Sequence, residues 1–325
     1  MDPDPLEDLQ ARAERVLLGG DRKYTRHDLA ELTGRDPEGL RQLWRALGFA
    51  TIGDDNRVFT DADLEAIRLT DGLLDAGLIT PGTESAVTRA MGHHLARLAE
   101  WQILMLRSFF AERPEVALDS RQAERILETT LPALEHLLTY VWRRQLASYA
   151  GRALAASEDD FQSRSQVVGF VDMVGYTRMT RRIDEIQLGT VLERFETVAT
   201  DVIAEHHGRV VKMIGDEVLF VADQPADAAE IALTMNERAE ADEDIPELRT
   251  GLAWGRVLDR LGDVYGPVVN LAARLTSVAR PGTILIDQEL AAALEGNAGY
   301  EMRTKRPVSV RGYSKLKPIV LRWAN

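Results

Sequence analysis

Residues Val210-Val-Lys-Met-Ile-Gly-Asp-Glu-Val-Leu-Phe220 form two short runs of mostly β-branched and aliphatic side chains, separated by Gly215-Asp216. A Gly-Asp pair between two such runs predicts a β-hairpin with a tight turn. The turn would hold the Asp216 carboxylate at the hairpin tip, with Lys212 on the incoming strand. A carboxylate in that position suits a hard cation such as Mg²⁺, which takes oxygen ligands and often shares them with substrate phosphates. Gly-Asp is also an ordinary turn dipeptide, so the neighbouring segments have to decide between these interpretations.

Strand-like and helix-like segments alternate around this hairpin, over residues 167–325. A strand at Val167–Val171 ends at Asp172, and an amphipathic helix over 182–206 leads into the hairpin. The segments that follow are helix 226–239, strand 252–257, helix 268–279, strand 283–286 and strand 319–323. This order predicts an α+β fold in which helices cover a largely antiparallel sheet.

Two carboxylates of this half are expected to meet. In a split βαβ arrangement the first strand lies beside the hairpin, so Asp172 and Asp216 reach one edge of the sheet. Two carboxylates beside a nucleoside triphosphate make a site for two Mg²⁺ or Mn²⁺ ions. In such a site one ion activates an attacking hydroxyl and the other holds the departing phosphates.

Two other pairs of side chains add to this chemistry. Asn270 and Arg274 are four residues apart on the predicted helix 268–279, so they share a face. An amide and a guanidinium are suited to orienting a ribose and to stabilising charge on a reacting phosphate. Lys212 and Asp263 offer one donor and one acceptor, which match the N1 acceptor and the amino donor of adenine.

Three motifs carry these residues, and together they resemble the motifs of the class III nucleotidyl cyclases. They are Phe170-Val-Asp-Met-Val-Gly-Tyr-Thr177, Lys212-Met-Ile-Gly-Asp-Glu217 and Gly262-Asp-Val-Tyr-Gly-Pro-Val-Val-Asn-Leu-Ala-Ala-Arg274. The resemblance covers about residues 165–325. It implies a ferredoxin-like βαββαβ palm with a mainly antiparallel sheet, and the conversion of ATP to 3′,5′-cyclic AMP and pyrophosphate.

The resemblance also implies a role for each of the six residues. These roles are metal binding by Asp172 and Asp216, adenine selection by Lys212 and Asp263, and transition-state support by Asn270 and Arg274. Guanylyl cyclases of the family differ at the two base-reading positions, so the pair present here implies ATP as the substrate.

The family also implies how the site is assembled. One subunit supplies the metal carboxylates and the other supplies the base-reading and transition-state residues, so a homodimer carries two composite sites. A basic residue near the C-terminus is expected to contact the phosphates, and both Arg311 and Lys315 are candidates.

The first half, residues 1–156, is expected to be entirely helical. Thr25 is placed to begin a helix that Gly34 ends, and Pro37 can open a second helix. This pattern resembles the helix-turn-helix of MerR-type regulators, which leaves open a DNA-binding role or a borrowed protein–protein module. The net charge of −13 is shared by both halves, and neither has an excess of Lys and Arg. Nucleic-acid binding is therefore disfavoured.

Two longer helices are predicted over 83–111 and 120–156, and their apolar stripes are typical of bundles or of helices that pair between subunits. The polar residues 157–166 are expected to link them to the catalytic domain, 167–325. The helical half resembles the regulatory region of mycobacterial-type soluble cyclases. A small molecule, a lipid or pH is therefore expected to act on it as the effector.

The composition limits the kinds of metal site and the cellular location that can be expected. The chain has no cysteine, so neither disulfides nor thiolate metal sites are available. The first residues lack the pattern of a signal peptide and no apolar run is long enough to span a bilayer, so the cytoplasm is expected.

Two other kinds of protein share features with this sequence. A diguanylate cyclase also carries Gly-Asp-Glu in a hairpin, but Ile214 and Val218 depart from the residues which that family needs. The second alternative is a one-component DNA-binding regulator whose cyclase-like half only senses a nucleotide. A binding-only site would have no need for Asn270 and Arg274.

Overall fold

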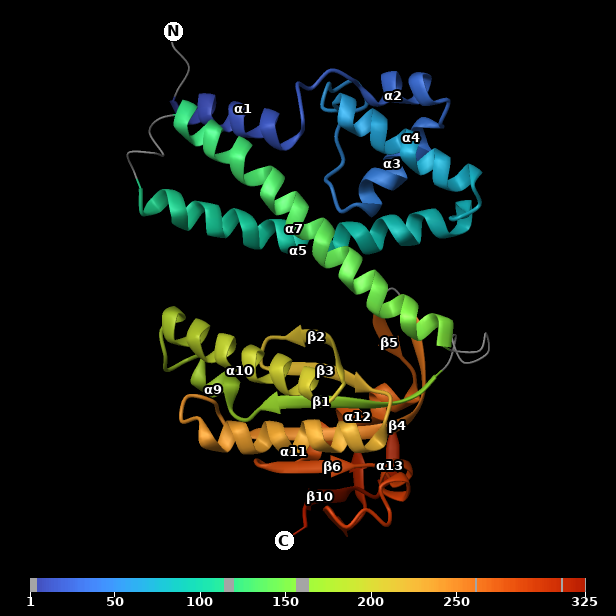
Figure 1. The fold of residues 1–325 in the computed structure, drawn as a ribbon, viewed down its shortest axis with the longest axis vertical. Helices are drawn as coiled ribbons and strands as arrows, with labels where there is room; N and C mark the ends of the chain where they lie inside the picture. Colours follow the sequence, from blue (N-terminus) through green and yellow to red (C-terminus); the bar gives the residue numbers. More distant parts are fainter. Residues whose placement is uncertain (1–4, 114–119, 156–163, 261, 311, 325) are drawn as a thin grey trace. The chain divides into compact units, whose positions relative to one another are not determined.

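The computed structural model describes residues 5–113, 120–155, 164–260, 262–310 and 312–324, drawn in Figure 1. The chain divides into two compact units, Met1–Gly151 and Arg152–Asn325. Most of the expected linker 157–166 lies outside the described residues, and its last three residues belong to the first strand of the second unit.

The first unit is built from helices, and this prediction is confirmed for its described residues. The helices are α1 (Pro5–Leu17), α2 (Arg26–Thr33), α3 (Pro37–Ala46), α4 (Asp61–Asp75), α5 (Pro81–Ala111) and α7 (Ser120–Ala155). Thr25 caps α2 in a capping box with Asp28, and Gly34 ends it at a φ of 72°. The left-handed conformation at Gly34 is one that residues with a Cβ rarely adopt.

Helices α2, α3 and α4 share a small apolar core, to which an isolated bridge between Tyr24 and Phe59 adds the only strand-like pairing described in this unit. Helix α3 also packs closely on α5. A Cβ at Gly92 of α5 would lie 2.4 Å from the carbonyl oxygen of Leu47, just after α3, so only glycine permits this approach. Part of the helix-turn-helix-like segment is thus covered by a long helix of its own unit.

The second unit contains a mixed sheet with the strand order β2-β3-β1-β4-β6-β10-β7, and β5 pairs with β4 at one side. Its strands are β1 (Arg164–Met173), β2 (Arg209–Ile214), β3 (Glu217–Ala222), β4 (Leu248–Arg260), β5 (Asp263–Tyr265), β6 (Thr283–Ile286), β7 (Tyr300–Thr304) and β10 (Ile319–Trp323). A separate pair joins β8 (Val308–Val310) and β9 (Tyr313–Leu316). Every pairing is antiparallel except that of β4 with β6.

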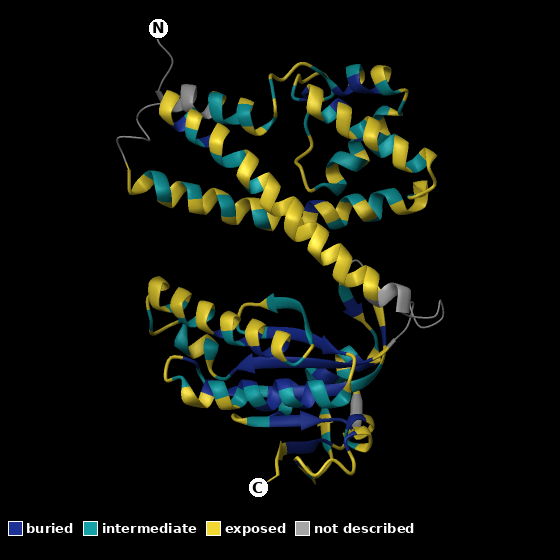
Figure 2. Ribbon diagram, viewed as in Figure 1, coloured by how far each residue is buried: buried dark blue, intermediate teal, exposed yellow. Residues whose placement is uncertain are grey.

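Helices cover both faces of this sheet. The order β1, α10 (Glu185–Glu205), β2, β3, α11 (Pro225–Ala241), β4 confirms the predicted βαββαβ core. Helices α10 and α11 pack on one face through Phe195 and Met235, and α12 (Pro267–Val278) packs on the other through Ala272. The short helices α9 (Tyr176–Met179) and α13 (Gln288–Ala293) complete the unit. Figure 2 shows that β1 and β3 are mostly buried, whereas β2 is drawn as intermediate.

Helix α12 lies unusually close to the sheet. A Cβ at Gly251 of β4 would lie 2.3 Å from the amide nitrogen of Thr276 and 2.4 Å from the carbonyl oxygen of Ala272. No other residue fits there, so Gly251 sets the height of α12 above β4. Within the described residues, none of the helices combines the length and the apolar character that crossing a bilayer requires.

Candidate active site

The two predicted metal-binding carboxylates lie on adjacent segments. Asp172 is the penultimate residue of β1 and is 7% exposed, while Asp216 lies in the turn between β2 and β3. Gly215 adopts a φ of 63° in that turn. The amide of Met173 donates to the carbonyl oxygen of Asp216 at 3.0 Å, which ties the hairpin turn to the end of β1.

The side chains of these two residues also interact. Burial raises the pKa of Asp172, and the negative charge of Asp216 and a side-chain hydrogen bond with it act in the same direction. The neighbouring Arg249 opposes this rise in the pKa. Two like charges held together in this way favour a bound cation, because a cation relieves their repulsion.

Asp172 is the middle member of a row across three strands. It lies opposite Glu217 of β3 on one side and opposite Arg249 of β4 on the other. The Nε atom of Arg249 donates to Oδ2 of Asp172 at 2.5 Å, and an Nη atom forms an ion pair with the same oxygen. Burial, followed by the charges of Asp172 and Asp216, raises the pKa of Glu217 to about 7.

The sequence reasoning missed Arg249 and gave Glu217 no role. The predicted strand began at Leu252, whereas β4 begins four residues earlier at Leu248. Leu248 is buried and Arg249 is partly exposed, but Thr250, Gly251, Leu252 and Ala253 are all buried, so this stretch carries no clear period of two that would have indicated the longer strand.

The predicted base-reading residues form a pair. Lys212 of β2 donates from Nζ to Oδ2 of Asp263 on β5 at 2.7 Å, and both side chains are partly exposed. A register shift between Val210 and Lys212 interrupts the pairing of β2 with β3. Such a bulge redirects a side chain on its strand.

Asn270 and Arg274 lie on α12 as predicted, one turn apart and on the same helix face. Asn270 is exposed and Arg274 is half-buried. In the described part of the chain, neither side chain has a hydrogen bond or ion pair with another residue. The single chain therefore brings the six residues together as two contacting pairs, Asp172 with Asp216 and Lys212 with Asp263, and a third pair on α12.

The donor set fits a divalent cation that keeps other ligands. The described residues contain no group of three or more His, Cys, Asp or Glu arranged to hold a metal ion. Two carboxylates leave the remaining positions to water and phosphate oxygens, which is how Mg²⁺ is usually bound in nucleotide enzymes. Of the two C-terminal candidates, Arg311 lies outside the described residues, and Lys315 is exposed on β9.

Comparison with known proteins accounts for both units. Residues 161–322 match the adenylate and guanylate cyclase catalytic domain, and residues 5–146 match the adenylate cyclase regulatory domain. An adenylate cyclase of Streptomyces coelicolor is 45% identical over 294 residues, which cover 90% of this chain and 77% of that protein. An adenylate cyclase of Glutamicibacter nicotianae is 37% identical over 339 residues, covering 98% and 83%.

Among solved structures, the adenylyl cyclase CyaB of P. aeruginosa is similar with a TM-score of 0.44 and 22% identity. The match covers 50% of this chain and 95% of that one. The fold and the site together define a class III nucleotidyl cyclase. With the relatives named above, the chain belongs to the adenylate cyclase family, as an enzyme with a cyclase catalytic domain and a regulatory domain. Cyclase domains of this class use divalent metal ions.

Proposed function

We propose that the protein converts ATP to 3′,5′-cyclic AMP and pyrophosphate at two composite sites of a homodimer. The observation that carries this proposal is the contact between Lys212 and Asp263, 2.7 Å apart, in a chain that also brings Asp172 and Asp216 together. One pair offers a donor and an acceptor to adenine, and the other offers oxygen ligands to metal ions.

The proposed chemistry is an in-line displacement at the α-phosphorus. A bond forms between the ribose 3′-oxygen and the α-phosphorus, the bond to the bridging oxygen of pyrophosphate breaks, and the hydroxyl proton leaves to solvent. Asp172 and Asp216 would hold two Mg²⁺ or Mn²⁺ ions, which when bound activate the hydroxyl and neutralise the departing phosphates. Asn270 orients the ribose, and Arg274 stabilises the negative charge that develops on the phosphate.

A second copy of the chain completes each site. Within one chain, neither Asn270 nor Arg274 has a side-chain partner among the described residues, although both lie on the helix face that carries the predicted chemistry. In the proposed dimer, Lys212, Asp263 and the α12 pair of one subunit face Asp172 and Asp216 of the other. The two-fold symmetry then produces two equivalent sites.

We assign residues 1–156 to regulation and dimerisation, 157–166 to the linker and 167–325 to catalysis. The surface of α7 supports a role in pairing. Its exposed large apolar side chains are Leu137, Leu138, Tyr140, Val141, Trp142, Leu146 and Tyr149. Such a density of exposed apolar side chains on one helix is typical of a surface that contacts a partner. Because the reaction consumes ATP, we place the enzyme in the cytoplasm.

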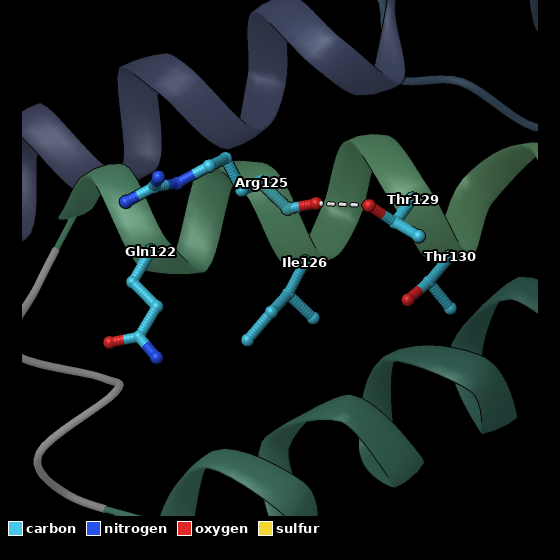
Figure 3. A pocket seen from close by; sticks show the side chains of 5 residues that line it. All are labelled: Gln122, Arg125, Ile126, Thr129 and Thr130. Carbon is cyan, nitrogen blue, oxygen red and sulfur yellow. Dashed lines mark hydrogen bonds between the residues drawn. The ribbon is translucent and has the colours of Figure 1, made fainter.

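A shallow hollow beside α7 is a candidate place for an effector (Figure 3). It has a volume of about 500 Å³ and is lined by Gln122, Arg125, Ile126, Thr129 and Thr130. Its aliphatic, hydroxyl and amide groups suit a small amphipathic ligand, with the Arg125 side chain at one end. The hydroxyl of Thr129 is already used, since it donates to the carbonyl oxygen of Arg125 at 2.8 Å.

The DNA-binding alternative finds no support in the basic residues near α3. Arg41 is paired with Glu38 and with Asp54, and Arg35 is paired with Asp71 and with Glu84. Guanidinium groups already engaged by carboxylates attract phosphates weakly. A mobility-shift measurement with duplex DNA at low salt is therefore expected to show no specific complex.

One experiment tests the proposed function directly. The purified chain is incubated with ATP or with GTP, each with Mn²⁺, and the products are separated and identified by mass. Cyclic AMP and pyrophosphate in equal amounts are expected from ATP. Cyclic GMP as the main product, or release of inorganic phosphate without a cyclic nucleotide, would overturn the proposal.

A further inference from the structure

Arg249 has no part in the reaction chemistry proposed above, yet it contacts one of the two proposed metal-binding carboxylates. It lies on β4 directly opposite Asp172 of β1, 77 residues earlier in the chain. Two of its nitrogen atoms converge on one carboxylate oxygen, Oδ2 of Asp172, with the Nε contact at 2.5 Å. This oxygen is one of the atoms that a bound metal ion would need.

The surroundings of Asp172 explain why a cation is placed there. Asp172 is 7% exposed, and the carboxyl groups of Asp216 and Glu217 both act on it electrostatically. A buried carboxylate with like-charged neighbours is costly unless a positive charge compensates it. A guanidinium is suited to this task, because it stays charged at every physiological pH and offers several donors in a fixed plane.

We propose that Arg249 is the internal counter-ion of the metal-free active site, and that a divalent cation competes with it for Asp172. The inference rests on the proposed assignment of Asp172 and Asp216 as the metal-binding pair. Arg249 is a positioning residue in this scheme: it holds the Asp172 carboxylate in place before the metal arrives.

A competition of this kind has two linked consequences. Arg249 stabilises the metal-free fold, and by the same interaction it weakens metal binding. Removing its charge should therefore lower the stability of the metal-free protein and tighten its affinity for the ion. A purely structural role predicts the first effect without the second.

The test is a titration of the full-length chain with Mn²⁺ in the absence of nucleotide, with the free ion measured by electron paramagnetic resonance. Arg249→Gln is expected to bind Mn²⁺ about tenfold more tightly than the unaltered chain, within the usual range of coupling between two sites. Arg194→Gln is the matched control, because Arg194 forms ion pairs with Asp242 and Asp244 away from the candidate site. Unchanged or weaker Mn²⁺ binding by Arg249→Gln overturns the inference.

Thermal unfolding gives a second, independent readout. In a chelating buffer Arg249→Gln should melt at a lower temperature than the unaltered chain, and saturating Mn²⁺ should remove most of the difference. A deficit in melting temperature that persists in full at saturating Mn²⁺ contradicts the counter-ion role.

If Arg249→Gln does not fold, Arg249→Lys serves instead. This variant keeps the positive charge but loses the planar guanidinium, and it should bind Mn²⁺ more tightly than the unaltered chain by a smaller factor. Equal or weaker binding by this variant overturns the inference.

A third variant separates failure of the inference from failure of the proposed function. Asp216→Asn is introduced into the unaltered chain and into Arg249→Gln, and should weaken Mn²⁺ binding in both. If Asp216→Asn has no effect on Mn²⁺ binding, the metal-site assignment is wrong. If binding depends on Asp216 but is the same with and without Arg249, only the counter-ion inference is wrong.

Discussion

Lys212 and Asp263 are 51 residues apart in the chain, yet Nζ of the lysine lies 2.7 Å from Oδ2 of the aspartate. Each satisfies the other when no nucleotide is bound. In the proposed site, an adenine ring that enters between them would replace one ion pair with two hydrogen bonds, and a base with the opposite donor and acceptor pattern would leave both groups mispaired. Substitution of both residues therefore tests whether they select the base.

The double substitution Lys212→Glu with Asp263→Cys is expected to lower kcat/KM for ATP by roughly 10²-fold or more, because polar groups of the site are left without partners. Some activity with GTP should appear. The matched control is Arg209→Gln with Asp259→Asn, which removes an ion pair of 3.1 Å between β2 and β4. An unchanged preference for ATP in the first variant would exclude Lys212 and Asp263 from the base pocket.

Arg274→Ala is expected to lower kcat by about 10²–10³-fold, the usual loss for one positioned group that stabilises a transition state. KM for ATP should change much less, because the charge it stabilises develops only during the reaction. Steady-state kinetics at several ATP concentrations separate the two parameters. Arg280→Ala, just beyond the end of α12, serves as the control. A loss confined to KM would instead assign Arg274 to substrate binding.

Asp172→Ala and Arg274→Ala should each have very little activity alone and clearly more when mixed. The reason is that the substitutions damage opposite halves of a composite site, so a mixed dimer retains one intact site. The measurement is cyclic AMP production after co-expression of two differently tagged chains and purification through both tags. Mixed dimers that are as inactive as their parents would show that the site lies within one chain.

The stability of the catalytic unit is expected to depend on pH through Asp287. This residue caps α13 by accepting hydrogen bonds from the amides of Leu290 and Trp254, and burial raises its pKa to about 7. The folded state therefore binds a proton that the unfolded state, with a pKa of about 3.9, has already lost. The stabilising contribution is complete below about pH 4 and is lost as the pH rises to about 7.

Asp287→Asn keeps the accepting oxygen and removes the titration. Relative to this variant, the unaltered chain should lose up to about 1.4 kcal/mol of unfolding free energy per pH unit across that window. Urea unfolding at pH 5, 6, 7 and 8 measures the difference. Asp184→Asn, at the exposed cap of α10, controls for loss of charge at a helix N-terminus. A constant difference between Asp287→Asn and the unaltered chain would show that Asp287 does not titrate in this range.

Residues 164–325 alone should differ from the full chain by several-fold or more in specific activity, and we expect the shorter chain to be the more active. Its response to pH or to an apolar ligand should be smaller. Both proteins are assayed across a dilution series and a pH series. If the helical half only holds the dimer together, the two activity curves will coincide once the dimer concentration is matched, and the regulatory role fails.

Local signals predicted the parts of the fold that depend on short-range chemistry. Gly215-Asp216 gave the hairpin turn, Thr25 and Gly34 gave the ends of α2, and the helix carrying Asn270 and Arg274 begins within one residue of its predicted start. Each of these features is decided by residues a few positions apart, so the chain itself carries the signal.

Contacts between strands that are far apart in the sequence could not be predicted from such local signals. Nothing near Arg249 indicates that it lies opposite Asp172, because that contact is set by the register between β1 and β4. The β-bulge before Lys212 and the pairing of β10 with both β6 and β7 are set in the same way, by partners distant in sequence. A sequence pattern shows that a strand exists, but its neighbours are chosen by tertiary packing.

Strand β1 begins at Arg164, is hydrogen-bonded on one edge to β3 and on the other to β4, and carries Asp172 near its far end. Ten residues in extended conformation make a rod of roughly 33 Å. From Val167 to Asp172 this rod is hydrogen-bonded on both edges, to β3 and to β4, so a displacement at its first residues is expected to move the sheet as one body. In the proposed dimer, a signal that enters at Arg164 is therefore expected to reorient one catalytic unit against the other, and to change turnover while the metal affinity of each proposed carboxylate pair stays the same.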